Sequence, residues 1–215
     1  MNLLFRGAAC APLLALLAGC CANNANTCDD LQEDSLFLVL DPNSFTSQEL
    51  DTVYLQRFTP AAPARPATGT LPTIPAQPEG PPSAPISIVQ NRQTLVNSGL
   101  LRKLSAGNLK AASTIVISNT NPFGPSSAGG KLSAYGYILT VEDRSVKPRT
   151  TYRYRLDNIV LQGRYEANGC TTCYENTKKV VQLTGKTTPP PFDATEKNRK
   201  DDVKVPVPLI ITKND

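Results

Sequence analysis

The sequence predicts a mainly β protein: a single antiparallel β-sandwich or barrel-like domain with at most one short helix. About eight short apolar or alternating segments carry the β-branched and aromatic residues that favour strands. Clusters of Gly, Pro, Asn and Asp separate them, as expected for turns. No regular helical segments lie between them, which disfavours a parallel α/β fold. The chain has no Trp and one Met, so we expect a core of Val, Ile, Leu and Tyr.

Two strands and one helical turn are predicted before residue 60. Residues 36–40 form a short apolar run that ends at an Asp-Pro-Asn turn, which is typical of a buried strand. Thr46 and Glu49 have the spacing of a capping box, which predicts a helical turn. Residues 51–58, DTVYLQRF, then favour a second strand.

The other strands are predicted after residue 85. Apolar spacing over 92–105 allows a short helix, although Gly99 weakens it. The last strand contains Pro206 and Pro208, which favour a position at a sheet edge. Apolar or alternating runs predict strands at 86–90, 113–118, 131–142, 150–166, 176–186 and 203–213.

A Pro-rich segment over residues 59–85 interrupts this series and holds nine of the chain's 19 prolines. Proline fixes φ and removes backbone donors, so the segment favours an extended conformation. It is interpreted as a surface loop or spacer, with a PxxP-type ligand as the alternative. Two strands alone cannot hold a core. We therefore expect residues 36–215 to form one β-rich domain that contains this loop.

Residues 1–19 have the pattern of a secretory signal peptide. One charge, Arg6, precedes an apolar run that is too short to span a bilayer comfortably. The run ends in Leu17-Ala18-Gly19-Cys20, which resembles the lipobox of bacterial lipoprotein precursors. Residues 20–35 are small and polar, then acidic, and are predicted to form a flexible tether.

The lipobox resemblance implies cleavage before Cys20 and acylation of that residue, for example with palmitate. Several acyl chains together anchor a protein durably. The implied location is the outer membrane, at its periplasmic face or at the cell surface, with the membrane as a partner through the lipid anchor. The layout is also loosely similar to small β-rich bacterial lipoproteins of uncharacterised function, through the Cys-acidic tether, FTSQELDTVYLQRF, a late CxxC and the terminal LIITK.

Cys170 and Cys173 lie beside an Asn-Gly pair between two long predicted strands, which places them at a hairpin tip. No helix follows them to lower a thiol pKa, as it does at a thioredoxin-type site. A structural disulfide between them is favoured, with a second between Cys21 and Cys28. A redox-active pair and a metal site are the alternatives; the chain has no His to complete a metal site.

The strand that contains Tyr152-Arg153-Tyr154-Arg155, within residues 147–155, is the candidate binding site. Stacking tyrosines and cations could bind glycans or single-stranded nucleic acid. Strand alternation, however, sends the two tyrosines to one face and the two arginines to the other. Tyrosines in the core with arginines in water are the alternative explanation.

These observations predict a non-enzymatic, lipid-anchored domain that acts by binding or scaffolding. The absence of His removes the commonest general base, and no cofactor or metal is expected. The net charge of +4 is small, which argues against a nucleic-acid partner. Envelope proteins or glycans are the expected partners. The alternative functions are a thiol–disulfide redox protein that uses Cys170 and Cys173, and a glycan-binding module that uses the strand within 147–155.

Overall fold

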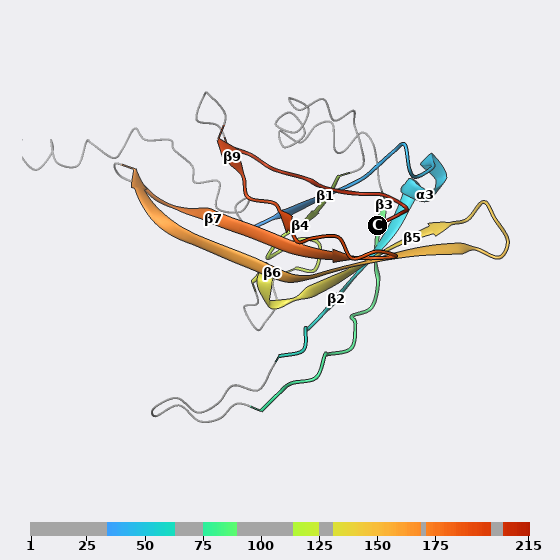
Figure 1. Ribbon diagram of the computed structural model, residues 1–215, viewed down its shortest axis with the longest axis horizontal. Coiled ribbons are helices and arrows are strands. Elements are labelled where there is room, and N and C mark those ends of the chain that lie inside the picture. The colour runs from blue at the N-terminus through green and yellow to red at the C-terminus, as the bar shows by residue number, and fades with distance from the viewer. Residues whose placement is uncertain (1–33, 63–74, 90–113, 125–130, 169–170, 199–203) are drawn as a thin grey trace, which may run out of the picture.

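A computed structural model describes residues 34–62, 75–89, 114–124, 131–168, 171–198 and 204–215 (Figure 1). It confirms the mainly β, sandwich-like fold. The larger sheet has six strands in the order β3-β2-β5-β6-β7-β8. These strands are β3 (Ile86–Val89), β2 (Thr52–Phe58), β5 (Gly136–Asp143), β6 (Thr150–Asn168), β7 (Thr171–Thr184) and β8 (Phe192–Asp193).

A smaller sheet has the order β11-β1-β4. Its strands are β11 (Leu209–Ile211), β1 (Leu36–Leu40) and β4 (Thr114–Ile117). A two-stranded ribbon pairs β10 (Lys204–Val205) with β9 (Lys197–Asn198). The helical elements in the described residues are α3 (Ser47–Asp51) and a 3-10 turn, η1 (Leu132–Ala134). The helix considered at 92–105 lies outside the described residues.

The core lies between the two sheets and consists mainly of aliphatic side chains, as predicted from the composition. Alternate residues of β2 and β5, among them Leu55 and Leu139, are fully buried on one face of the larger sheet. They pack with Leu38 of β1 and Ile117 of β4 from the smaller sheet. Burial of each such side chain contributes about 1.5–3 kcal/mol. The period-2 pattern thus leaves the opposite face of the larger sheet for polar residues.

One strand pair differs from the antiparallel prediction. β11 lies parallel to β1, with Leu38 opposite Leu209, whereas the other named pairs are antiparallel. β11 is an edge strand, as Pro206 and Pro208 before it predict. Sequence alternation cannot reveal strand direction, since both directions use the same period.

The predicted capping box is present at α3. Thr46 Oγ1 accepts a 3.3 Å hydrogen bond from the Glu49 amide, and Glu49 Oε2 accepts one of 2.7 Å from the Thr46 amide. The Glu49 side chain is 0% exposed and forms a 2.8 Å ion pair with Lys213. Burial acts to raise the pKa of Glu49, but the hydrogen bonds from Lys213 and Thr46 outweigh it, so the pKa lies below the ordinary 4.5.

A Glu49→Gln variant is expected to show a flatter loss of stability in acid than the unmodified protein. Because folding lowers the Glu49 pKa, its ionised form stabilises the fold above the unfolded-state pKa. This contribution is lost as the pH falls through the lower, folded-state value. Urea unfolding at a series of pH values from about 6 to 3 measures the difference in slope. Parallel curves for the two proteins would contradict the assignment.

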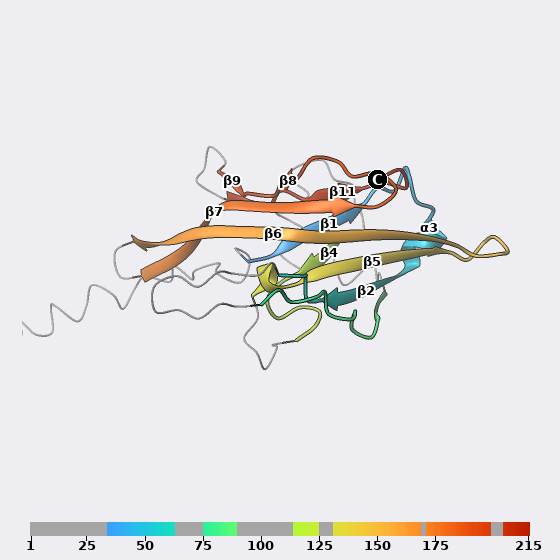
Figure 2. The same cartoon turned by 60° about the horizontal axis from the view of Figure 1, so that its bottom comes forward.

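β6 and β7 form a long hairpin that runs to one end of the molecule (Figures 1 and 2). The ladder is irregular between Asp157 and Val160, where Asn158 has a φ of 48°. Asn is among the residues that adopt this left-handed conformation at low cost. Because the irregularity shifts the alternation, both Leu156 and Ile159 face the core. The predicted strands at 150–166 and 176–186 are both longer in the structure.

The folded domain begins before the predicted end of the tether at residue 35. Asp34 accepts a 2.9 Å hydrogen bond from the Asn119 side chain, and Ser35 is buried. The Ser35 carbonyl accepts a 3.0 Å hydrogen bond from Lys179 Nζ of β7. The last two residues of the predicted tether are therefore held by the domain, while residues 20–33 lie outside the described residues.

Candidate functional site

The Tyr/Arg strand divides between the two faces of the larger sheet, as its alternation predicts. Tyr154 is 2% exposed and lies in the core, with Tyr152 packed against the core on the same side. Arg153 and Arg155 lie on the other, outer face. Stacking tyrosines and adjacent arginines therefore do not form one mixed surface on this strand.

Both tyrosines are already used in packing. The Phe45 ring meets each of them edge to face, at centroid distances of 6.0 Å for Tyr152 and 6.2 Å for Tyr154. Lys186 and Lys213 lie over the Tyr152 ring, each 5.3 Å from its centroid. Burial raises the pKa of Tyr154. Tyr152 and Tyr154, two of the four candidate binding residues, therefore contribute to packing within the sandwich.

Arg155 holds the Pro-rich segment against the outer face. Its guanidinium forms a two-pronged ion pair with Glu79, at 3.0 and 2.5 Å, and Nε donates a 2.6 Å hydrogen bond to Asp157. The same group lies 4.1 Å from the centroid of the Phe58 ring. The hydrogen bonds from Arg155 lower the pKa of Glu79. Arg155 therefore has a structural role, and its charge is neutralised locally.

The described end of the Pro-rich segment, residues 75–85, is fixed along β2 by further hydrogen bonds. The Gly80 amide donates to Thr59 O at 2.9 Å, and Gln56 Nε2 donates to Ser83 O at 2.9 Å. β3, which follows the segment, pairs antiparallel with β2, which precedes it. The segment therefore connects neighbouring strands of one sheet, and its last residue, Pro85, forms one wall of a groove.

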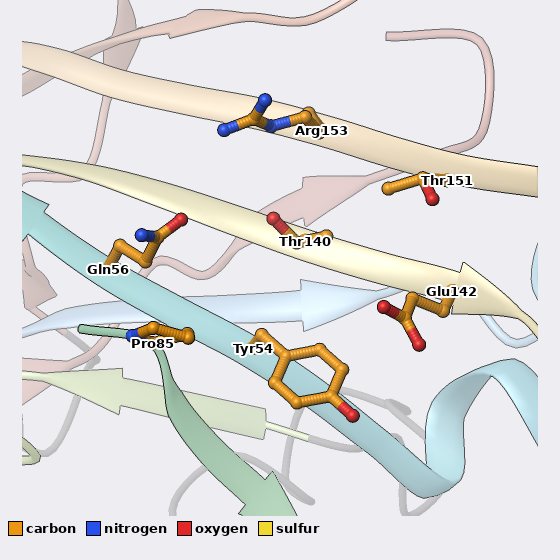
Figure 3. A pocket seen from close by; sticks show the side chains of 7 residues that line it. All are labelled: Tyr54, Gln56, Pro85, Thr140, Glu142, Thr151 and Arg153. Carbon is orange, nitrogen blue, oxygen red and sulfur yellow. The ribbon is translucent and has the colours of Figure 1, made fainter. Parts of the chain in front are cut away.

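The groove lies on the outer face of the larger sheet and has a volume of about 420 Å³ (Figure 3). Three adjacent strands supply its floor, so its side chains come from segments far apart in the sequence. In Figure 3 these side chains stand in front of β2, β5 and β6, with the smaller sheet behind. The lining residues are Tyr54, Gln56, Pro85, Thr140, Glu142, Thr151 and Arg153.

The strand register brings three of these residues into one row. Tyr54 of β2 is opposite Thr140 of β5, and Thr140 is opposite Arg153 of β6. Neighbouring strands lie about 4.8 Å apart, so the backbones of Tyr54 and Arg153 are separated by about 10 Å. A ring and a cation thus flank a hydroxyl group across the groove.

Arg153 differs from the other arginines on this face. Arg155 is paired with Glu79 and Asp157, and Arg144 is bonded to Tyr54 and Glu142. Arg153 has no hydrogen bond or ion pair with any residue that the structure describes, and it is exposed. Its guanidinium is therefore available to a ligand in the groove.

The cysteine predictions fall largely on residues outside the described ranges, namely Cys20, Cys21, Cys28 and Cys170. Cys173 forms a disulfide bond. The predicted hairpin is present, because β6 pairs with β7 as far as Asn168 and Thr171. A bond from Cys173 to Cys170 would have to span Thr171 and Thr172, which are extended. The pairings, and the redox alternative, stay predictions.

Two further features are absent from the described residues. They contain no cluster of three or more His, Cys, Asp or Glu side chains that could hold a metal ion. Within the same ranges, no helix has the length and apolar character required to cross a membrane.

The structure is thus a β-sandwich-like domain with an open groove of mixed polar and aromatic lining. No protein-family model, curated protein or solved structure matches the chain. Of the predicted binding residues, Arg153 alone lines this groove, and Tyr54, Gln56, Thr140 and Glu142 were missed. The alternating polar positions of the two strands that carry them were the available signal.

Proposed function

We propose that this protein is a lipid-anchored β-domain of the cell envelope that acts by binding, and that the groove on the outer face is its ligand site. The lipobox at Leu17–Cys20 supports the anchor and the outer-membrane location, at the periplasmic face or the cell surface. Arg153, a cation without a partner among the described residues in a groove of about 420 Å³, is the observation that carries the binding role.

Binding is proposed rather than catalysis because the groove holds few groups that transfer protons. The chain has no His, and Glu142 is the single carboxylate among the described lining residues. General acid–base reactions usually use His or a second carboxylate. Arg144 also bonds to Glu142, at 3.4 Å, which engages that carboxylate.

Photo-crosslinking in a diderm bacterium tests this proposal. A benzoylphenylalanine introduced at Thr151, on the exposed rim of the groove, is expected to yield an adduct that is lost when Arg153→Gln is added. The same group at Lys178, exposed on β7 and outside the lining, is the matched control and should yield none. Radiolabelled palmitate should enter the protein, and Cys20→Ala should abolish both this label and membrane fractionation.

Each part of the proposal can fail separately. Equal adducts from Thr151 and Lys178, or none from Thr151, would overturn the groove as the ligand site. Palmitate label that persists in Cys20→Ala would overturn the lipid anchor at Cys20 and would not affect the proposal that the groove is the ligand site.

A further inference from the structure

The groove combines an aromatic ring, whose position is fixed, with hydrogen-bonding groups around it. Arg144 donates a hydrogen bond to the Tyr54 hydroxyl group, and Glu142 in turn binds Arg144. Arg144 therefore contacts the ring at its hydroxyl end, with its Cζ 5.9 Å from the centroid. Figure 3 looks onto the outer face and shows the Tyr54 ring nearly broadside. A ring in this orientation offers a flat apolar surface to a ligand that lies along the sheet.

Polar groups of both kinds surround this ring. Thr140 and Thr151 carry hydroxyl groups that donate and accept, and Glu142 carries an acceptor. Gln56 uses its amide nitrogen on Ser83 O, which leaves its oxygen as an acceptor facing the groove (Figure 3). Such alternation of donors and acceptors beside a flat apolar surface matches a sugar ring, which has C–H groups on its faces and hydroxyl groups on its edge.

Arg153 adds a requirement for negative charge. Its fork of N–H groups matches the two oxygens of a carboxylate and binds them in parallel. The strand register sets it in the same row as Tyr54, about 10 Å away across two strand spacings. A ligand that covers the Tyr54 ring and reaches Arg153 therefore carries its anionic group close to the sugar that lies on the ring.

A peptide is a poorer occupant of this position. Peptides that join a sheet need a strand edge with unpaired backbone groups. Beneath the Tyr54 ring β2 is paired on both sides, with β3 and β5, and β5 is paired on both sides, with β2 and β6. The β6 segment at Thr151 and Arg153 pairs with β5 alone, because its ladder with β7 begins at Arg155, but its other edge lies two strands away from Tyr54. Pro85 and Tyr54 are the only apolar or aromatic residues among the described lining residues, and the other five are polar or charged, so the groove holds no apolar pocket for a peptide's side chain.

We propose that the ligand of the groove is a glycan that carries a carboxylate on one of its sugars; this proposal rests on the groove being the protein's binding site. Tyr54 stacks on a sugar ring, Thr140 and Thr151 bind its hydroxyl groups, and Arg153 binds the carboxylate. Removing the charge at Arg153 therefore weakens the binding of an acidic glycan and leaves the binding of a neutral one unchanged, whereas removing the Tyr54 ring weakens the binding of both.

Calorimetric titration of the full-length protein in detergent micelles tests the ligand class. The probes are oligosaccharides containing galacturonate, glucuronate, N-acetylneuraminate or N-acetylmuramate, each with a counterpart whose carboxyl group is reduced to an alcohol. At least one acidic member should bind, and its reduced counterpart should bind about tenfold or more weakly, as expected for loss of a charged hydrogen bond. Arg153→Gln should abolish this preference, and Arg153→Lys should retain part of it.

The controls separate the ligand class from the site. Arg149→Gln removes an exposed cation that does not line the groove and should leave the affinity unchanged; an equal loss there would reduce the effect to general attraction and overturn the proposal. Equal affinity for acidic and reduced glycans would overturn the proposal that the ligand carries a carboxylate. A loss of affinity in Tyr54→Ala would still support the groove as the binding site. If no member of the panel binds, the proposed ligand class is wrong. Crosslinking from Thr151 then tests independently whether the groove is the ligand site.

Discussion

Replacing Lys179 with alanine is expected to lower the free energy of unfolding by about 3–5 kcal/mol, the cost of breaking a buried ion pair from one side. Lys179 Nζ forms an ion pair with Glu196 and donates a 3.0 Å hydrogen bond to the Ser35 carbonyl. The two charged side chains are 1% and 6% exposed. Alanine would remove a cation that pairs with Glu196 in this buried site, together with a hydrogen bond that holds the start of β1 to β7.

Urea unfolding measures this loss. Lys178→Ala, at the exposed neighbouring position on β7, is the matched control and should change stability by no more than about 0.5 kcal/mol. Lys179→Met combined with Glu196→Leu should recover most of the loss, because apolar side chains replace both charges at once. A Lys179→Ala protein within about 1 kcal/mol of the unmodified chain would show that Glu196 finds water or another cation.

Lys179 illustrates what the sequence could and could not predict. Within β7, Lys179, Val181 and Leu183 occupy alternate positions and are all buried, so the period-2 pattern alone assigns Lys179 to the core face. A lysine there requires a partner. That partner, Glu196, follows a Pro-rich turn and the two-residue strand β8. Neither has a pattern strong enough to fix its place over β7.

The groove was partly predictable for the same reason. Alternation assigns Tyr54, Gln56, Thr140 and Glu142 to the polar faces of their strands. Their assembly depends on strand order, since β2 is a neighbour of β3 and of β5 although long segments separate it from both in sequence. Pairing across such distances depends on tertiary packing, which local patterns do not encode. The capping box at Thr46, by contrast, involves residues three apart and was predicted in full.

The second large loss of stability is expected from Gly136→Ala. A Cβ at this position would lie 2.2 Å from Phe58 Cζ and 2.7 Å from two further atoms of that ring. Phe58 is 2% exposed, with the Arg155 guanidinium over its ring. Arg155, which Glu79 and Asp157 hold, lies against the ring and limits how far it can move away from the new methyl group. We expect a loss of about 1–3 kcal/mol, as for other overpacked sites.

The same substitution should loosen the Pro-rich segment, because Arg155 links Phe58 to Glu79. Faster hydrogen exchange at the Gly80 and Ser83 amides, which donate to Thr59 O and Arg57 O, would report this directly. Gly80→Ala is the matched control, since its Cβ would approach Thr59 no closer than 3.4 Å. A smaller residue at Phe58 should relieve the clash, so Gly136→Ala should cost less in a Phe58→Leu background. An equal loss of stability in both backgrounds would show that the strain lies elsewhere. The contacts of Phe58, Arg155 and Glu79 would then not depend on the absence of a side chain at Gly136.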